Sequence, residues 1–250
     1  MARIIAFANQ KGGVAKTTST LATGAALAEI GRRVLLVDID AQGALTFSMG
    51  LDPDEIDETV NDVLVRRLPV EKVVISREVD LVPANIDLAG AEAVLLAKTG
   101  REYALQRALR DVDNTYDYIL IDCPPSLGIL TINGLTAAQE VVIPLQCEAL
   151  SHRGVGQLIE TLNDIRHFTN PDLAITGVLP TMYDTRLNHA KEVVADVGQR
   201  YGVKVFDPPV RKSIRFAEAS QAGKSILSFA PKHPGAEAYR ELARQLEGAV

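Results

Sequence analysis

The sequence predicts an α/β fold in which a mostly parallel, twisted sheet carries helices on both faces. Short apolar runs alternate along the chain with longer helix-like segments, which is the order that βαβ units produce. The short runs are apolar at consecutive residues, as in strands that are covered on both sides. Because crossovers between parallel strands are right-handed, the expected product is one sheet between two helical layers.

The expected strands, in chain order, are Ile4–Ala8, Val34–Val37, Val79–Pro83, Tyr118–Ile121, Val141–Leu145, Ile175–Leu179 and Val203–Phe206. The expected helices are Thr17–Ile30, closed by Gly31, then Leu88–Ala97, Tyr103–Val112, Leu150–Phe168, Ala190–Tyr201 and Ala236–Leu246. The segments Ala41–Thr59 and Asp207–Lys212 are expected to be irregular. Since no repeat or long linker interrupts the series, residues 1–250 are predicted to form a single domain.

Composition excludes several classes of protein. A chain of 250 residues with 47% apolar residues is neither disordered nor collagen-like. Two cysteines in separate apolar segments indicate reduced thiols in a cytosol, and no apolar run is long enough for a membrane span or a signal peptide. We therefore expect a cytoplasmic protein, and the net charge of −6 by itself argues against a nucleic-acid partner.

A glycine-rich loop follows the first expected strand directly. The residues Asn9-Gln10-Lys11-Gly12-Gly13-Val14-Ala15-Lys16-Thr17-Thr18 lead straight into a helical pattern. Backbone N–H groups of such a turn, with a helix N-terminus behind them, can hold phosphate groups. In this context Lys16 is placed to contact the β and γ phosphates, and Thr17 to bind Mg²⁺.

The loop departs from the standard pattern G-x-x-x-x-G-K-[ST], because Gln10 and Ala15 stand at the positions of its two outer glycines. Taken alone, it could be an ordinary strand-to-helix turn. The additional lysine, Lys11, makes Lys11-Gly12-Gly13-x-x-Lys16-Thr17 similar to the deviant Walker A motif of the ParA/MinD group of P-loop ATPases.

Two further strands end in carboxylates. Val34–Val37 leads to Asp38 and Asp40, and Tyr118–Ile121 leads to Asp122 and two prolines. Acids at the carboxyl ends of buried strands lie where a P-loop protein holds Mg²⁺, so Asp122 is the predicted Walker B residue. Asp40 is a candidate for orienting the attacking water. Aspartate also ends strands for purely structural reasons, but three motifs in this order favour the functional interpretation.

Together these motifs, with Thr181-Met182-Tyr183-Asp184-Thr185-Arg186, make the chain resemble ParA/Soj-type partition ATPases from Arg3 to about Leu246. The resemblance implies a P-loop NTPase fold, slow hydrolysis of ATP with Mg²⁺, and an ATP-dependent homodimer. It also implies non-specific binding to double-stranded DNA, stimulation by a ParB-like partner, and association with the nucleoid. Because the chain starts at the first strand, we expect no N-terminal helix-turn-helix domain.

The resemblance also assigns residues. Lys11 would reach the nucleotide of the opposite subunit, and Gly12 would allow the close approach. The nucleotide-binding set would comprise Lys11, Gly12, Gly13, Val14, Ala15, Lys16, Thr17 and Thr18, with Met182 and Val210 near the adenine base. Asp40 would serve the attacking water, and Thr17 and Asp122 the metal.

Three positions depart from the family pattern. Ala15 replaces the usual Gly, Ala41 the usual Pro, and Pro209-Val210-Arg211 the usual Ile-Pro-Arg. We expect Ala15 to be tolerated if its φ stays negative. Nucleotide affinity and base selectivity are the properties that these departures affect.

The distribution of charge qualifies the argument against nucleic acid. Residues 1–180 carry a net charge of −9, whereas residues 181–250 carry +3. The resemblance places DNA-contacting arginines at Arg186 and Arg215, and Arg211 lies in the same basic stretch. A solvated helical face would explain such a run equally well without the family context. A dimer would double the patch, so we expect DNA binding that depends steeply on salt and hardly on base sequence.

Other functions compete with DNA partition. The same chemistry could position a protein cargo, since the partner chooses the cargo. A MinD-like membrane regulator would need an amphipathic C-terminal helix, but Glu237–Glu247 carries three acids, so no stable membrane anchor is predicted. An iron–sulfur ATPase would need a set of cluster cysteines, which Cys123 and Cys147 do not resemble.

Overall fold

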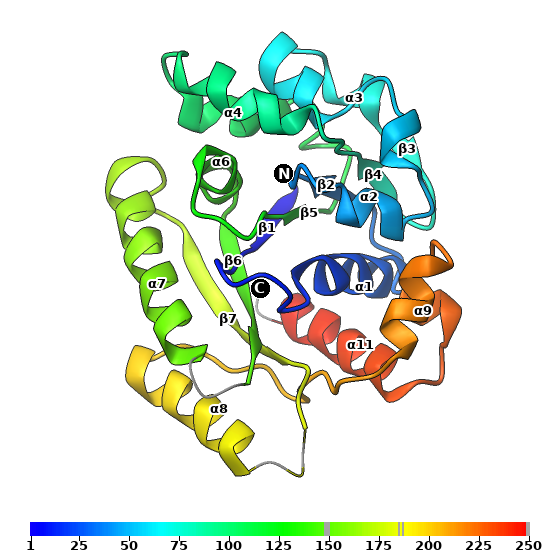
Figure 1. Ribbon diagram of the computed structural model, residues 1–250, viewed down its shortest axis with the longest axis vertical. Coiled ribbons are helices and arrows are strands. Elements are labelled where there is room, and N and C mark those ends of the chain that lie inside the picture. The colour runs from blue at the N-terminus through cyan, green and yellow to red at the C-terminus, as the bar shows by residue number, and fades with distance from the viewer. Residues whose placement is uncertain (148–150, 185, 187, 249–250) are drawn as a thin grey trace.

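The structure, a computed structural model, describes residues 1–147, 151–184, 186 and 188–248 (Figure 1). Its sheet has the strand order β3-β4-β2-β5-β1-β6-β7, and the strands are parallel except for β3, which pairs antiparallel with β4. The strands are β1 (Arg3–Phe7), β2 (Val34–Asp38), β3 (Ile75–Ser76), β4 (Asp80–Val82), β5 (Tyr118–Asp122), β6 (Glu140–Gln146) and β7 (Ala174–Thr181). The predicted α/β architecture is confirmed.

The α-helices are α1 (Lys16–Glu29), α2 (Ala44–Ser48), α3 (Val70–Val73), α4 (Leu88–Leu96), α5 (Ala104–Leu109), α6 (Ile129–Ala137), α7 (Ser151–Phe168), α8 (Asn188–Tyr201), α9 (Arg215–Gln221), α10 (Ile226–Phe229) and α11 (Pro234–Glu247). Short turns of other helical types are η1 (Pro53–Glu55), η2 (Asp62–Arg66) and η3 (Arg101–Tyr103).

Two apolar cores lie on opposite faces of the sheet, because alternate residues of a strand point to opposite sides. In β1, Ile4 and Ala6 pack into the core under α4 to α8, whereas Ile5 and Phe7 pack into the core under α1 and α11. Both sets are at most 7% exposed. This two-sided burial explains the apolar runs that predicted the strands.

The helix α1 lies unusually close to the sheet. A Cβ placed on Gly24 would come within 2.6 Å of Leu36 Cδ2, so any larger residue at this point of the helix would have to displace the Leu36 side chain. Helix α11 packs beside α1, and its apolar residues Tyr239, Leu242 and Leu246 are buried there. The apolar face that a membrane-binding helix would need is thus covered by the protein itself. None of the described helices has the length and hydrophobicity to cross a bilayer.

The prediction of a last strand over Val203–Phe206 is wrong. Only Val205 forms a bridge, to Val178 of β7, and the backbone continues the ladder with two hydrogen bonds through Lys204 O and Phe206 N. Asp207 is followed by Pro208 and Pro209, which have no N–H to donate, so the pairing cannot extend.

Other boundaries differ as well. The segment expected to be irregular at Ala41–Thr59 contains α2 and η1, and the helix expected over Tyr103–Val112 is the shorter pair of η3 and α5. Helices α3, α6, α9 and α10, the turn η2 and the short strand β3 were not predicted. The start of the expected helix Leu150–Phe168 lies outside the described residues.

Candidate functional site

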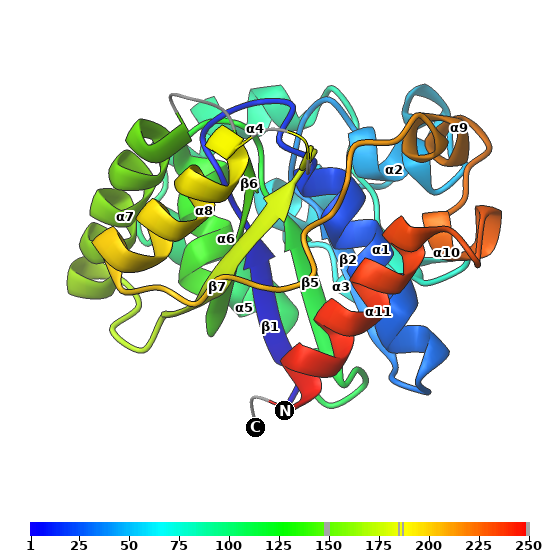
Figure 2. The same ribbon diagram turned by 90° about the horizontal axis from the view of Figure 1, so that it is seen from below.

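Three neighbouring strands bring the predicted motifs together at one edge of the sheet. Strand β5 lies between β1 and β2, and Asp122 at its end is in register with Phe7 on one side and Asp38 on the other. The glycine-rich loop follows Phe7, and Asp40 follows Asp38. Figure 2 shows β1, β5 and β7 running toward this end of the molecule, where α1 begins.

The glycine-rich loop is held at both ends and leaves its amides open. The Asn9 side chain donates to Pro144 O and accepts from Lys11 N, and the Thr181 hydroxyl donates to Val14 O. The backbone N–H groups of residues 12–18 donate no hydrogen bond to any described residue. A row of open N–H groups before a helix N-terminus is the arrangement that binds phosphate.

Ala15 does not keep a negative φ as expected. It lies in the left-handed region with φ 64° and ψ 33°, directly before α1. A Cβ in this region costs roughly 1–2 kcal/mol, which a glycine at the same position avoids. The loop therefore retains the backbone shape that glycine would favour, at a cost in stability.

The two lysines point in different directions. The side chain of Lys16 is buried and its Nζ donates to Lys11 O at 3.3 Å, across the loop. Burial lowers the pKa of Lys16, although Asp122 and Asp40 act in the opposite direction. Lys11 is exposed and its Nζ donates to Gln146 Oε1 at 3.2 Å, at the end of β6. Within one subunit only Lys16 spans the loop.

Thr17 and Asp122 are in direct contact. The Thr17 hydroxyl donates to Asp122 Oδ2 at 2.7 Å, and the Thr20 hydroxyl to Asp122 Oδ1 at 3.3 Å. Asp122 is fully buried, and burial together with repulsion by Asp38 raises its pKa well above the ordinary value. The predicted metal-binding pair is thus assembled, with a carboxylate that a cation would stabilise in its charged form.

Asp38 is a member of this site that the sequence assignment omitted. Its carboxylate is fully buried and accepts from the Thr46 hydroxyl, Thr46 N and Asp40 N at 2.8 to 3.1 Å. Burial raises its pKa in spite of these donors. The Asp-x-Asp spacing was a sufficient signal, since every second residue of a strand shares a face.

Asp40 is better placed for contact with solvent or substrate. Its side chain is partly exposed, and Oδ1 accepts only the local bond from Gln42 N, at 3.0 Å. Within the described residues, no cluster of three acidic, histidine or cysteine side chains could hold a metal by itself. A cation at this edge would therefore need the Thr17 hydroxyl and oxygen atoms of a bound phosphate.

The residues expected near an adenine base lie beside one another. Tyr183 N, next to Met182, donates to Val210 O at 3.0 Å, and Val210 N donates to Pro180 O at 2.8 Å. Met182 has a positive φ of 48°. The side chain of Val210 is 3% exposed and packs in the core under α11. It therefore supports the backbone of this segment from the core side.

The basic residues of the C-terminal portion do not join the site. Arg186 is 86% exposed and forms a bidentate pair with Asp184, with N–O distances of 2.9 and 2.7 Å. Arg215 begins α9, pairs with Glu218 at 2.7 Å and lies over the ring of Phe229. Arg211 is exposed on the segment between α8 and α9. Of the motif around Arg186, Thr185 lies outside the described residues.

One contact links the site to α9. Thr46, which binds Asp38, belongs to α2, and Ser48 at the end of α2 shares a 2.7 Å hydrogen bond with Ser220 of α9. Behind it the backbones of Gly50 and Gly223 meet. A Cβ on Gly223 would lie 2.5 Å from Gly50 Cα, so the two turns touch main chain to main chain.

Comparison with known proteins agrees with this geometry. The model of the AAA domain family matches residues 2–175. The chain is 45% identical to the sporulation initiation inhibitor protein Soj of Bacillus subtilis, covering 98% of both chains. It is 42% identical to the chromosome partitioning protein ParA of Caulobacter vibrioides, covering 98% of this chain and 93% of the relative.

Solved structures show the same architecture. A crystal structure from Mycobacterium smegmatis, described as cobyrinic acid a,c-diamide synthase with bound ADP and magnesium, is 51% identical to this chain. It superposes with a TM-score of 0.89 and covers 99% of this chain and 94% of that chain.

Proposed function

The chain belongs to the ParA/Soj family of P-loop ATPases, and we propose that it forms an ATP-dependent dimer that binds DNA and segregates or positions it. As a member of this family it is an ATP hydrolase that works with Mg²⁺. The observation that carries the proposal is the open amide row of residues 12–18 beside Lys16 and the Thr17–Asp122 pair.

Residue roles follow from this geometry. The amides and Lys16 would hold the phosphates, and Thr17 would bind Mg²⁺ with Asp122 behind it, accepting the Thr17 hydroxyl proton. Asp40 would orient the attacking water, because its carboxylate is the exposed member of the acidic set. Asp38 positions Asp40 through the backbone hydrogen bond to its N–H.

Support for a dimer comes from Gly12 and Lys11. A Cβ on Gly12 would make only an ordinary 3.8 Å contact with Pro125, and its φ is not positive, so nothing within one subunit requires glycine. A residue without a Cβ here leaves room for a bound nucleotide or a second subunit to approach the backbone. Lys11 is exposed and its Nζ lies toward β6, which suits a cation that reaches a partner's γ-phosphate.

ATP would switch DNA binding through this lysine. The γ-phosphate supplies the charge that attracts Lys11 of the other subunit, so ADP should leave the dimer weaker. The dimer would bring two copies of Arg186, Arg211 and Arg215 together on an otherwise acidic protein. Backbone contacts of this kind are non-specific and weaken steeply with salt.

The test is a DNA-binding titration with ATP, ADP and no nucleotide at two salt concentrations. We expect DNA binding in the presence of ATP but not in the presence of ADP or without nucleotide. The Arg186→Ala/Arg215→Ala variant should lose DNA binding, while its ATP hydrolysis in the absence of DNA persists. Equal binding with ATP and ADP, or parental binding by the double variant, would refute the proposal. Lys11→Ala should bind ATP yet remain monomeric by light scattering.

The name of the Mycobacterium smegmatis structures suggests a second function, ATP-dependent formation of an amide on a corrinoid acid. Release of ammonia from glutamine commonly uses a reactive thiolate. Both cysteines of this chain are buried and their pKa values are raised by burial, that of Cys147 to about 12. ATP turnover that depends on cobyrinic acid and ammonia, and not on DNA, would favour this second function.

The cargo and the stimulating partner define the finer function. We propose a ParB-like protein as the partner and nucleoid-bound DNA as the location, by analogy with the ParA relatives. Stimulation of ATP turnover by a purified ParB-like protein in the presence of DNA would test this, and a protein-cluster adaptor that stimulates it instead would point to a protein cargo.

A further inference from the structure

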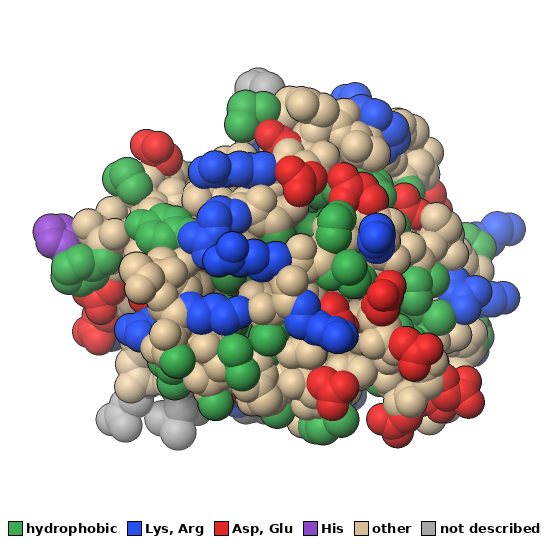
Figure 3. All heavy atoms as spheres, turned by 90° about the horizontal axis from the view of Figure 1, so that it is seen from above, with side chains coloured by type: hydrophobic (Ala, Val, Ile, Leu, Met, Phe, Trp, Pro, Cys, Tyr) green, Lys and Arg blue, Asp and Glu red, His purple; other side chains and the backbone are tan. Residues whose placement is uncertain are grey.

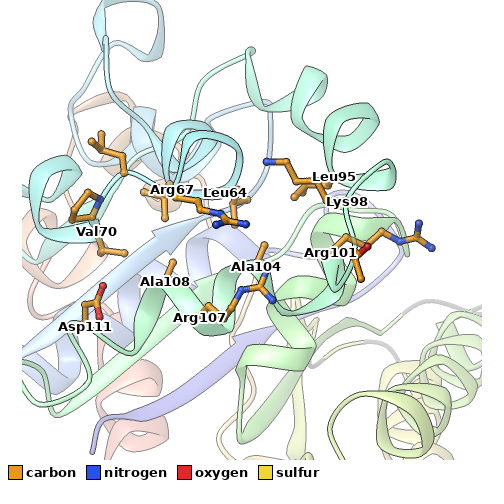
Figure 4. A pocket seen from close by; sticks show the side chains of 14 residues that line it. Leu64, Arg67, Val70, Leu95, Lys98, Arg101, Ala104, Arg107, Ala108 and Asp111 are labelled. Carbon is orange, nitrogen blue, oxygen red and sulfur yellow. The ribbon is translucent and has the colours of Figure 1, made fainter.

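A pocket lies away from the nucleotide edge, in the helical layer formed by η2, α3, α4 and α5. Its volume is about 700 Å³. Figure 4 shows the side chains that line it, and none of them belongs to the glycine-rich loop, the strand ends or the basic C-terminal segment. We call it the α5 groove, and its lining residues include Leu64, Arg67, Val70, Leu95, Lys98, Arg101, Ala104, Arg107, Ala108 and Asp111.

The α5 groove is basic although the protein is acidic. Four cationic side chains, Arg67, Lys98, Arg101 and Arg107, line it together with the single acid Asp111. Figure 3, which looks onto the face of α3 and α4, shows Lys and Arg side chains gathered near its centre. In a chain of net charge −6 this local excess creates a field that attracts anionic groups.

Neutral acceptors position most of these cations. Lys98 Nζ donates to Val65 O at 2.6 Å, and Arg107 donates to Gly100 O at 3.1 Å. Arg101 donates to Leu96 O at 2.7 Å and is the only one of the four with an ion pair among the described residues, to Glu102. A backbone carbonyl orients a cation without cancelling its charge, so the groove keeps most of its positive potential.

The backbone at Arg67 is strained. Arg67 follows the π-helical turn η2 and has a φ of 59° and a ψ of 35°, a left-handed conformation that costs an L-residue roughly 1–2 kcal/mol. Its side chain is exposed and extends toward the middle of the groove in Figure 4. Strain of this kind and π-helical turns both concentrate at functional sites.

The floor of the groove suits a helix. Ala104, Ala108 and Asp111 lie on one face of the segment that contains α5, at i, i+4 and i+7, and the small alanines allow close approach. Ala104 and Ala108 belong to α5, and Asp111 lies in the turn that follows it.

We propose that the α5 groove binds an acidic amphipathic helix of a protein partner. Leucine-like side chains of the partner would pack on Ala104 and Ala108, and its carboxylates would pair with Arg67, Lys98 and Arg107. Charge complementarity selects the partner, because four cations and the single acid Asp111 line the groove around the small apolar Ala104 and Ala108. The proposal is independent of DNA partition, since it uses no residue of the nucleotide or DNA sites.

The test is fluorescence anisotropy with a labelled helical peptide of about 16 residues that has leucines at i, i+3, i+4 and i+7 and glutamates elsewhere. A matched peptide has lysines in place of the glutamates. We expect saturable binding of the acidic peptide only, weakened by added salt. The variant Arg67→Gly/Arg107→Glu should weaken it roughly tenfold or more.

Arg110→Glu is the matched control, because Arg110 is exposed at the end of α5 and does not line the groove. It should bind the acidic peptide as the parent does. Arg67→Gly alone removes a charge and relieves the positive φ, so it should weaken binding while its thermal unfolding midpoint stays the same or rises.

Three results would overturn the proposal: equal binding of both peptides, unchanged affinity in the double variant, or an equal loss in Arg110→Glu. Titration with tripolyphosphate separates a small-anion site from a peptide site. Saturable tripolyphosphate binding that the double variant loses, without peptide binding, would reassign the groove to a small anion.

Discussion

The nucleotide edge and the basic C-terminal segment are built in opposite ways. At the edge, Lys16, Asp38 and Asp122 are buried and have shifted pKa values. Each forms a hydrogen bond with a residue of the same site. In the basic segment, Arg186 and Arg215 are exposed and each pairs with an acid a few residues away. The buried part of the edge is therefore assembled within one subunit, whereas the role proposed for the arginines needs a second subunit or a DNA backbone to supply further charges.

This contrast predicts which substitutions change the protein itself and which change only its associations. Substitutions at the edge should alter hydrolysis and stability even without DNA. Substitutions of the arginines should leave the isolated subunit as it is.

The largest effect is expected for Asp40→Ala. If Asp40 orients the attacking water, ATP turnover should fall by a factor on the order of 100 or more, while ATP binding and the ATP-dependent dimer persist. Phosphate release and light scattering on the same sample measure the two properties. Loss of ATP binding would instead give Asp40 a structural role, like that of the buried residues at the edge.

Next is Asp122→Asn, measured without nucleotide or Mg²⁺. The pKa of Asp122 is raised in the folded protein, so the unfolded chain loses its proton first and stability falls as pH rises above the ordinary value of 3.8. The neutral amide avoids this loss, so the variant should be more stable than the parent by about 2 kcal/mol near neutral pH. The difference should shrink in acid.

Urea unfolding of both proteins at several pH values tests this. A difference that does not grow with pH would mean that the pKa of Asp122 is not raised in the folded protein. The same variant should bind Mg²⁺-ATP more weakly, because the metal loses the carboxylate behind Thr17.

A smaller effect is expected for Ala15→Gly. Relief of the positive φ should stabilise the protein by about 0.5–1 kcal/mol, since the greater freedom of glycine in the unfolded chain offsets part of the gain. The urea midpoint measures the change, with Ala138→Gly, where φ is −80°, as the opposite control. A lower midpoint for Ala15→Gly would show that Ala15 is not strained.

The smallest effect on the subunit is expected for Arg186→Ala. Its guanidinium is exposed and pairs only with Asp184, so the thermal midpoint and basal ATP turnover should not change measurably. DNA affinity should fall, and the dependence of affinity on salt should become less steep. A drop in stability would contradict the view that this surface is independent of the folded subunit.

The same contrast explains what could be predicted from the sequence. The strand-end motifs were predicted correctly because parallel strands place their carboxyl ends at one edge, so order along the chain translates into proximity. Asp38 was omitted as a site residue although its spacing from Asp40 carried the signal. The conformation of Ala15 was not predictable, since residue type alone favours a negative φ there.

The errors in the fold have physical reasons as well. Val203–Phe206 has the composition of a strand, but the prolines that follow end its pairing after one bridge. Helix α6 was missed because all but one of its residues are buried, so it lacks the polar face that marks an amphipathic helix. The α5 groove left no sequence signal, because its cations lie after η2, after α4, in η3 and in α5 and converge only in the folded chain.

The contact between Gly50 and Gly223 has a mechanical consequence. Because two main chains touch there, no side chain can yield at this point between the turns that follow α2 and α9. We expect a shift of α2 that follows from charge or ligand changes at Asp38 to push on α9, which carries Arg215. If Arg215 binds DNA as proposed, this contact would couple the nucleotide edge to the DNA-binding surface within a single subunit.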